Sequence, residues 1–412
     1  MKKPHLLMVG GWRLLLEKAI AVGFDVSFIG DTTAGEWRDG WLERTCVDVR
    51  HVAVEQVSTC VVQAREIHAR RPLTAAVSFS EFGLESAAVI SDALGIQGST
   101  VDIVSSTRYK DVMRGRLDAF PDLALRWQRV KSPEELRSFW ERHGPELILK
   151  PVSGVGSEGV FEIKNEQDLV ELTGEPEWQG DVPYLTEEFV PGDVLYSVET
   201  LTVGGEHRTV ATTLCKLVGD PCTVVNYVMT PPPAPYDGHV PAVSDTAHRL
   251  LDALELEWGV AHTEVKTRVD GRPVVIESQN RVGGQSISRM VEWSTGVLQI
   301  DAALGALVGK KPEFTDLPPA HKVAVAFSLL APAGRVTAVA DPKVLDGIGG
   351  VVGHEISVTV GAELPGRTDN SGRDALVWLT APSHEAAFET MRQICESYWV
   401  EYEEGYVWHP TF

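Results

Sequence analysis

The chain has 412 residues, of which 43% are hydrophobic and 23% are charged, a composition typical of a globular protein with several domains. Its 58 acidic and 37 basic side chains give a net charge of −21, which argues against nucleic acid or an anionic membrane as the main partner. The five cysteines form no CxxC pair, which indicates a reduced, cytoplasmic protein. No apolar stretch has the length of a membrane span or of a signal peptide.

The first hundred residues alternate between strand and helix patterns. The expected strands are His5–Val9, Asp25–Ile29 and Ala75–Phe79, and the expected helices are 12–21 and 81–94. This alternation predicts an open parallel sheet. Gly10–Gly11 follows the first strand, but the segment lacks a full GxGxxG, so a nicotinamide site is not favoured.

Glu81 follows the third expected strand at its carboxyl end, where open α/β sheets bind ligands. As the first residue of a helix it has a simpler explanation, because the helix dipole stabilises an acidic side chain there. The functional alternative is a contact to the amine of a substrate.

The next segment introduces basic residues. Ser105–Thr107 is expected to cap a helix that carries Lys110, Arg114 and Arg116. A strand is expected over 123–130, and Ser132 then begins a helix with a capping-box pattern.

Residues 146–163, ELILKPVSGVGSEGVFEI, predict a strand, a glycine-rich loop and a second strand. Glycines at 154, 156 and 159 let backbone N–H groups approach a polyanion closely, and Lys150 adds a positive charge where the first strand ends. It is not a Walker loop, because no GK[ST] is present and a strand follows. A glycine hairpin without a ligand is the alternative.

Residues 184–199 predict two strands separated by Pro191–Gly192. Such a hinge can offer backbone groups to the edge of adenine, with Glu187 or Glu188 facing the base or the ribose. An edge hairpin with two exposed glutamates is the alternative.

The stretch Val274–Gln285, VVIESQNRVGGQ, begins as a buried strand and ends in Gly283–Gly284. Upstream, Asp270–Gly271 is the pair that a two-residue type I′ turn prefers. Folding about this turn brings Glu264 near Glu277. Two carboxylates at that spacing suit Mg²⁺, which completes its coordination with phosphate oxygens and water; two solvated glutamates are the alternative.

The remaining segments predict further strands and helices of the fold. Antiparallel strands are expected over 195–203 and 207–217, and an amphipathic helix over 243–256. After a linker at 314–319 the chain predicts strands over 323–330 and 376–380, turns at 347–350 and 369–372, and a helix capped by Ser383 over 383–397. The C-terminal segment shows no catalytic set of its own.

Taken in chain order, these predicted elements and motifs resemble the ATP-grasp superfamily. Within it they resemble the carboxylate–amine ligases similar to the L-amino-acid (dipeptide) ligases. The resemblance covers essentially the whole chain. It implies an α/β and α+β fold class, with a Rossmann-like parallel-sheet domain before the ATP-grasp fold and an α+β domain after it. The implied domains are 1–104 (Rossmann-like), 105–188 (ATP-grasp small subdomain with the glycine loop), 189–318 (ATP-grasp large subdomain with the metal site) and 319–412 (C-terminal).

The resemblance also implies roles for individual residues. Lys110 and Lys150 would bind nucleotide phosphates, the loop Ser153, Gly154, Gly156, Ser157 and Gly159 would close over them, and the hinge Glu187, Glu188, Phe189 and Val190 would hold adenine. Glu264 and Glu277 would ligate Mg²⁺, Arg281 would act with Lys150 on the transferring phosphoryl group, and Glu81, Arg281, Gly283 and Gly284 would contact the substrate.

The sequence departs from the family pattern at two points. Gln279 stands where the family usually has asparagine in E-x-N, with Asn280 beside it. It keeps an amide oxygen as a metal ligand, with a reach longer by one methylene. Gln285 and Ser286 follow the double glycine where related ligases can carry a bulky residue, which indicates a roomier or more polar amine pocket.

The implied activity is the ATP-dependent joining of an amino-acid carboxylate to an amine, in a peptide or isopeptide bond, with Mg²⁺ as cofactor and Mn²⁺ as a substitute. The partners would be ATP and amino acids, and a homodimer is left open. Three rivals remain: another ATP-grasp ligation with a non-amino-acid substrate, a non-enzymatic ATP-binding regulator, and an NAD-dependent enzyme. The intact set Lys150, Glu264, Glu277 and Arg281 argues against the regulator.

Overall fold

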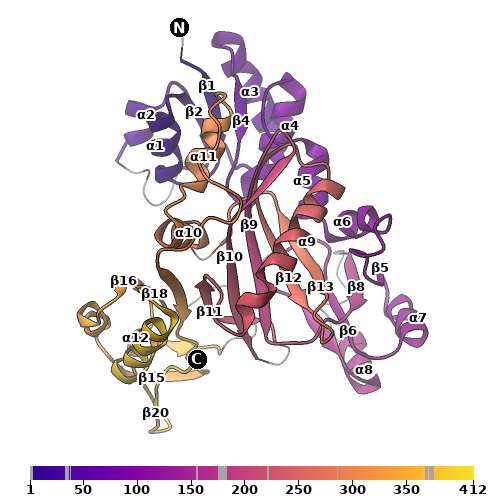
Figure 1. The fold of residues 1–412 in the computed structure, drawn as a ribbon, viewed down its shortest axis with the longest axis vertical. Coiled ribbons are helices and arrows are strands. Elements are labelled where there is room, and N and C mark those ends of the chain that lie inside the picture. Colours follow the sequence, from indigo (N-terminus) through magenta and orange to yellow (C-terminus); the bar gives the residue numbers. More distant parts are fainter. Residues whose placement is uncertain are drawn as a thin grey trace.

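The computed structural model describes residues 3–32, 37, 39–154, 156–174, 183–219, 222–284, 286–366, 370 and 375–412. Figure 1 shows an N-terminal sheet at one end of the molecule, a large sheet through the middle with a small sheet beside it, and the C-terminal segment at the other end. Among the described residues, no helix combines the length and the apolar character needed to cross a membrane.

The N-terminal sheet is parallel, as expected, with the strand order β3-β2-β1-β4. All five residues of β1 are buried because helices cover both faces of the sheet. The strands are β1 (His5–Val9), β2 (Asp25–Gly30), β3 (Val49–His51) and β4 (Ala75–Val77), and the helices are α1 (Arg13–Val22), α2 (Trp41–Thr45), α3 (Val57–Arg70) and α4 (Leu84–Leu94). A 3₁₀ turn, Glu81–Gly83, precedes α4.

The expected cap at Ser105–Thr107 is wrong. These residues lie inside α5 (Val101–Arg108), which is capped by Thr100, and Lys110 begins a separate helix, α6 (Lys110–Leu117). The hydroxyl groups of Ser106 and Thr107 donate to carbonyl oxygens four residues earlier, at 2.7 and 3.0 Å. Serine and threonine can therefore be satisfied inside a helix as well as at its start, so their clustering did not mark the boundary.

The small sheet is antiparallel, with the order β5-β8-β6-β7. Its elements are β5 (Trp127–Val130), α7 (Pro133–His143), β6 (Leu147–Pro151), β7 (Phe161–Ile163), α8 (Glu166–Gly174) and β8 (Tyr184–Glu188). The expected Ser132 cap is present at α7, although the returning bond of Glu135 involves Lys131 and not Ser132. The Ser132 hydroxyl accepts from the Glu135 N–H at 3.3 Å, and the Glu135 carboxylate accepts from the Lys131 N–H at 2.8 Å.

The large sheet has eight strands in the order β13-β12-β9-β10-β11-β14-β18-β16. Its strands are β9 (Val194–Val203), β10 (Glu206–Val218), β11 (Val224–Thr230), β12 (Trp258–Thr267), β13 (Pro273–Gln279), β14 (Val323–Ser328), β16 (Val351–Ile356) and β18 (Ala375–Ala381). Helices α9 (Val240–Ala253), α10 (Ile287–Thr295) and α11 (Gln299–Ala306) pack against it. The sheet passes from the central region into the C-terminal segment without a break, and the domain boundaries stay predictions.

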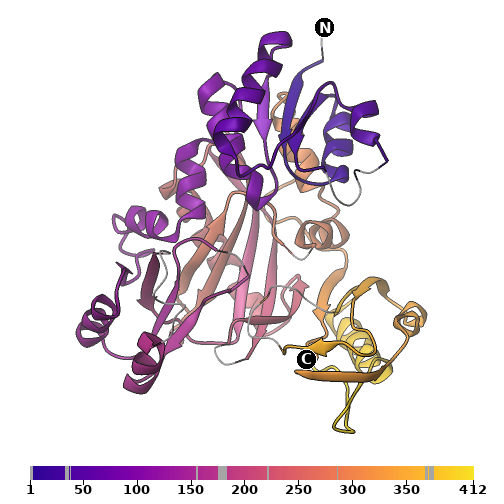
Figure 2. The ribbon, with the colours of Figure 1, turned by 180° about the vertical axis from the view of Figure 1, so that it is seen from behind.

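The C-terminal segment packs α12 (His384–Ser397) against β14 and β18, on the side of the molecule away from α7 and α8 (Figure 2). Ser383 caps α12, as expected, by accepting from the Ala386 N–H at 3.2 Å. The shorter strands here are β15 (Gly334–Val339), β17 (Glu363–Leu364), β19 (Val400–Tyr402) and β20 (Val407–Trp408). Of the turn expected at 369–372, only Asn370 lies within the described residues.

The hairpin β12–β13 forms as expected, and Glu264 lies directly opposite Glu277. Its turn differs from the two-residue type I′ turn. The N–H of Arg268 donates to the carbonyl of Arg272, and the N–H of Gly271 to the carbonyl of Arg268, at 2.9 and 2.8 Å. Three residues therefore form the loop. Only Gly271 has positive φ (82°), whereas a type I′ turn requires it at both central positions.

Candidate nucleotide and metal site

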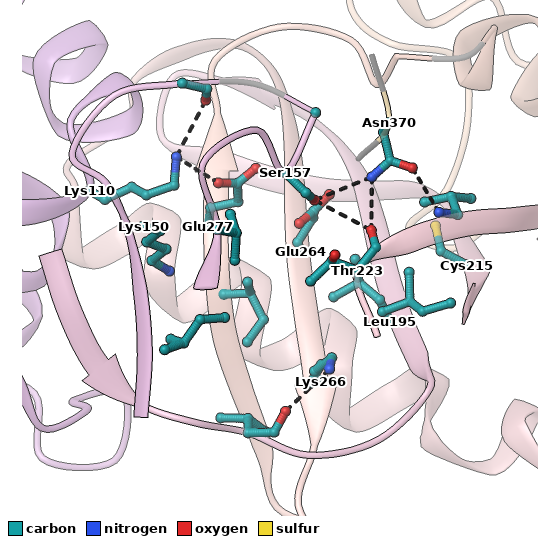
Figure 3. A pocket seen from close by; sticks show the side chains of 18 of the residues that line it. Lys110, Lys150, Ser157, Leu195, Cys215, Thr223, Glu264, Lys266, Glu277 and Asn370 are labelled. Atoms are coloured by element: carbon teal, nitrogen blue, oxygen red, sulfur yellow. Dashed lines mark hydrogen bonds and ion pairs between the residues drawn. The ribbon is translucent and has the colours of Figure 1, made fainter. Parts of the chain in front are cut away.

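A cavity of about 430 Å³ lies between the small sheet and the β12–β13 edge of the large sheet. Figure 3 shows side chains from both sheets and from the glycine loop around it. The expected site residues that border it are Lys110, Lys150, Gly154, Gly156, Ser157, Glu187, Glu188, Phe189, Val190, Glu264, Glu277, Gln279, Arg281 and Gly284. Those that do not are Glu81, Ser153, Gly159 and Gly283.

The period of β12 and β13 explains which side chains reach this cavity. Alternate residues of a strand point to the same face, so β12 directs His262, Glu264 and Lys266 into the cavity. Strand β13 directs Glu277 and Gln279 to the same place.

The hairpin carries a donor set that fits Mg²⁺. The Glu277 carboxylate accepts from the Gln279 amide nitrogen at 2.7 Å. The Gln279 amide oxygen is buried without a hydrogen-bond partner, as expected of an oxygen that ligates a cation. Among the described residues, no group of three or more His, Cys, Asp or Glu side chains is arranged to hold a metal ion. The candidate metal site therefore consists of two carboxylates, Glu264 and Glu277, and one amide oxygen.

Lys110, at the start of α6, lies against this carboxylate pair. Its Nζ is 3.0 Å from Glu277 Oε2 and also donates to the Gly154 carbonyl at 3.4 Å. Burial opposes the charge of Lys110, but Glu277 outweighs it and raises the lysine pKa. Burial likewise opposes the charge of Glu277, but Lys110 and Lys150 lower the pKa of this carboxyl to about 2. The positive charge of Lys110 thus lies between the carboxylate pair and the glycine loop.

Lys150, at the end of β6, is held by a buried ionic cluster. Its Nζ lies 2.9 Å from Glu187 Oε2, while Arg114 donates to both oxygens of Glu187, at 2.8 and 3.2 Å. Burial lowers the pKa of Lys150, and the attraction of Glu187 offsets only part of this effect. Burial would raise the pKa of Glu187, but Arg114 and Lys150 lower it to about 2. Glu187 therefore positions Lys150 rather than facing the cavity as a free group.

The other hinge residues are also tied to the protein. Glu188 forms ion pairs with Arg126, at 2.8 Å, and with Arg268. Lys266 donates to the carbonyl groups of Val190 and Gly192 at 3.2 and 2.8 Å. The N–H groups of Glu188 and Phe189 already donate to Arg126 and Glu146 carbonyls. The side chains of Phe189 and Val190 form part of an apolar wall with Leu125, Ile148 and Ile276.

The glycine loop is fastened by Asn370, a residue that the sequence did not single out. The Asn370 N–H donates to the Gly156 carbonyl at 2.7 Å, and its side-chain amide donates to Ser157 Oγ at 3.2 Å and to the Thr223 carbonyl at 2.8 Å (Figure 3). The side-chain oxygen accepts from the Val225 N–H at 2.7 Å. One asparagine thus connects the loop to β11, through contacts more than 140 residues apart in sequence.

Arg281 and Glu81 meet although they are 200 residues apart. Arg281 Nε donates to Glu81 Oε2 at 2.7 Å, and Arg108 donates to the Glu81 carbonyl at 2.8 Å. Glu81 does not border the cavity itself, but it pairs with the arginine that does. The carboxyl end of the N-terminal sheet therefore reaches the candidate reaction centre.

His262 forms a second buried cluster, which the sequence analysis missed. Its Nδ1 lies 2.5 Å from Glu199 Oε1, and its Nε2 lies 3.6 Å from Glu264 Oε1. Burial opposes protonation, but Glu199 and Glu264 raise the pKa of His262 to about 10. Glu199 also accepts from the Gly283 N–H at 3.3 Å. A Cβ at Gly283 would lie 2.8 Å from the imidazole, so the backbone approach requires glycine here.

Comparison with known proteins identifies a domain family within the chain. Residues 144–289 match the family model described as ATP-grasp domain. The chain therefore contains a match to the ATP-grasp domain over these residues, and the fold class expected from the sequence is confirmed.

The chain is also similar in sequence to a ligase. It is 23% identical over 288 residues to alanine–anticapsin ligase of Bacillus subtilis, a match that covers 64% of this chain and 59% of that protein. The chain spans about half the length of the curated relatives it matches (52% and 59% for two of them).

Solved structures show the same fold over nearly the whole chain. The L-amino acid ligase from Bacillus licheniformis superposes with a TM-score of 0.80 at 20% identity, covering 98% of this chain and 100% of that one. N5-carboxyaminoimidazole ribonucleotide synthetase from Thermotoga maritima gives 0.70 at 18% identity, with coverage of 98% and 100%.

Proposed function

We propose that this protein is an ATP-dependent ligase that joins the carboxylate of an amino acid to an amine, with release of ADP and phosphate. The observation that carries the proposal is one cavity in which Glu264 and Glu277 face each other beside Lys110, Lys150 and Arg281. The ATP-grasp domain and the similarity to two amino-acid ligases support it.

The residues of the cavity would have different roles in phosphoryl transfer. Glu264, Glu277 and Gln279 would hold Mg²⁺, which supplies charge neutralisation at the phosphates, and Mn²⁺ is expected to substitute. Lys150, fixed by Glu187, adds a positive charge that needs no rearrangement during the reaction. Lys110 is close enough to Glu277 to exchange that carboxylate for a phosphate oxygen.

The chemistry follows from the weak electrophilicity of a carboxylate. An oxygen of the carboxylate attacks the γ-phosphorus, the bond to ADP breaks, and an acyl phosphate forms. The amine then attacks the acyl carbon and loses a proton, and phosphate leaves with the electron pair of the C–O bond. Arg281 stabilises the phosphoryl oxygens, and the glycine loop held by Asn370 keeps water from the acyl phosphate.

Glu81 and Arg281 together match the two ends of an amino acid. Their side chains are 2.7 Å apart, and a bound substrate would replace this contact, with its ammonium group on Glu81 and its carboxylate on Arg281. This arrangement favours an amino-acid carboxylate as the activated group.

A screen of phosphate release over pairs of amino acids, with mass spectrometry of the products, tests the proposal. We expect ADP, phosphate and a dipeptide-sized product for at least one pair. ATP consumption without any amide product, or formation of AMP, would contradict it. A non-amino-acid carboxylate or amine is the second candidate, favoured by the similar fold of N5-carboxyaminoimidazole ribonucleotide synthetase. A homodimer remains part of the proposal, and light scattering would test it.

A further inference from the structure

The two carboxylates of the candidate metal site are held in different ways. Glu277 accepts from the Gln279 amide at 2.7 Å and lies 3.0 Å from the Nζ of Lys110. Among the described residues, Glu264 forms one ion pair, in which its Oε1 lies 3.6 Å from the Nε2 of His262. The orientation of the Glu264 carboxylate therefore depends on where the imidazole ring of His262 lies.

The backbone beneath Glu264 is irregular. Between Glu264 and Val265 the pairing of β12 with β13 shifts register, so that Ile276 has no partner. A bulge of this kind bends the strand and changes the direction of the side chains beside it. The regular alternation of the strand therefore does not by itself set the direction of the Glu264 carboxylate, and its contact with His262 contributes.

His262 is fixed through its other ring nitrogen. Its Nδ1 lies 2.5 Å from the Oε1 of Glu199, a fully buried residue of β9. Glu199 also accepts from the Gly283 N–H at 3.3 Å through its Oε2, so its carboxylate cannot rotate without losing one of these contacts. Both ring nitrogens of His262 face carboxylates, an arrangement in which each nitrogen acts as an N–H donor. The ring is thus a donor of fixed position for Glu264.

Charge balance for Glu199 is a simpler role, but it does not account for the place of the ring. A buried carboxylate needs a cation, and a basic side chain directed away from the cavity would supply one equally well. His262 instead borders the cavity, two residues from Glu264 and on the same face of β12. Carboxylates that ligate a metal ion are themselves held by neighbouring groups that fix their orientation.

On the basis of the ligase function and the metal site proposed above, we propose that His262 and Glu199 are positioning residues that hold Glu264 in the orientation that binds Mg²⁺. Glu199 anchors the ring through Nδ1, and the ring directs the Glu264 carboxylate through Nε2. Neither residue ligates the metal ion itself. Loss of such a supporting partner typically lowers metal affinity about 10- to 100-fold.

Two substitutions of His262 each keep one half of this arrangement. In His262→Asn the side-chain amide takes the place of Nδ1 and still donates to Glu199, but no donor reaches Glu264. In His262→Gln the longer side chain brings its amide close to the position of Nε2, so Glu264 keeps a donor and Glu199 loses its partner.

Titration of Mn²⁺ onto the protein in the presence of ADP, followed by electron paramagnetic resonance, measures metal affinity without turnover. The affinity for Mn²⁺ should fall about 10- to 100-fold in His262→Asn and by a smaller factor in His262→Gln. The melting temperature without metal should show the reverse order, because His262→Gln leaves the buried charge of Glu199 without a partner.

Two further variants separate positioning from stability. The double variant Glu199→Gln/His262→Asn has no buried charge in this pair, so it should be more stable than either single variant of His262 and still bind Mn²⁺ as weakly as His262→Asn. His5→Asn is the matched control, because His5 is also buried and its Nε2 lies 2.8 Å from Ser27 Oγ in the N-terminal sheet. This control should lower the melting temperature and leave the Mn²⁺ affinity unchanged.

Wild-type affinity for Mn²⁺ in His262→Asn and in the double variant would overturn the inference. A loss of Mn²⁺ affinity that follows the melting temperature through all variants, His5→Asn included, would overturn it as well. Weaker Mn²⁺ binding in His262→Asn, together with a wild type that forms no amide product, would support the positioning role and contradict the ligase function.

Discussion

The two ends of the cavity each carry a pair of glutamates, and the two pairs differ in their ion-pair partners and in the exposure of their side chains. At the hinge, Glu187 and Glu188 are held by Arg114, Lys150, Arg126 and Arg268, and the side chain of Glu187 is only 3% exposed. At the β12–β13 hairpin, Glu264 and Glu277 keep 24% and 22% of their side chains exposed. The cation nearest to Glu277 is Lys110, at 3.0 Å, and the cation nearest to Glu264 is the His262 imidazole, at 3.6 Å.

This difference shows that the role of a glutamate depends on the cations around it. At the hinge, fixed protein cations satisfy both carboxylates, and Glu187 also positions Lys150. At the hairpin, two carboxylates face each other beside a buried amide oxygen without a partner, so the site retains capacity for a metal ion. Both pairs consist of glutamates, so residue type alone cannot distinguish them.

The largest expected effect comes from removing charge at the hairpin. Glu277→Gln keeps the shape of the side chain but weakens metal binding, and kcat should fall by about 10²–10³-fold. Mg-ATP should raise the melting temperature of the wild type and raise that of the variant much less.

Glu188→Gln is the matched control at the hinge, where the lost carboxylate contacts only protein cations. We expect this variant to keep kcat and the Mg-ATP shift in melting temperature. If Glu277→Gln kept both as well, the hairpin would not be the metal site and the comparison would fail.

The contrast between the two ends also separates what local sequence could predict from what it could not. The Glu264–Glu277 pair was predictable because a turn signal and the period of two place both residues within a few positions of each other. The parallel N-terminal sheet and the Ser132 and Ser383 caps were also predictable, because each depends on a pattern within a short stretch of sequence. Gln285, which the sequence marked as a determinant of the amine pocket, lies outside the described residues.

The missed features are long-range. Arg114 meets Glu187 across 73 residues, Glu199 meets His262 across 63, and Asn370 meets Ser157 across 213. No local pattern indicates such pairs, because they depend on how the two sheets and the C-terminal segment pack. The ion pairs of Glu187 with Arg114 and Lys150 were therefore not foreseen, and its contact with the nucleotide stays a prediction.

The second prediction tests the hinge as a structural ion cluster. The pKa of Glu187 is about 2, below its ordinary value of 4.5, so the ionised carboxylate stabilises the fold. This contribution is fully present above pH 4.5 and is lost as the pH falls toward 2. Glu187→Gln should therefore lower the free energy of unfolding at pH 7 by about 3 kcal/mol.

Urea denaturation at several pH values measures this difference. The gap between wild type and Glu187→Gln should narrow between pH 4.5 and pH 2, because the wild-type carboxylate becomes protonated there. A gap that stays constant over this range would show that the loss arises from packing and not from charge.

The smallest expected effect concerns the glycine loop, which contacts the hairpin end through Lys110 and the sheet through Asn370. Gly156 has φ +69°, a left-handed conformation that costs a residue with a Cβ about 1–2 kcal/mol. Gly154 has no positive φ, and a Cβ there would meet only Pro151 at 3.9 Å. Gly156→Ala should therefore raise the ATP KM by about 5- to 30-fold, while Gly154→Ala should change it little.

The loop lies at the phosphate end of the cavity, so the affinity for adenosine, which lacks phosphates, should be the same in both variants. An equal loss of adenosine affinity in Gly156→Ala would show that the two ends are coupled and that the hinge does not act independently of the hairpin.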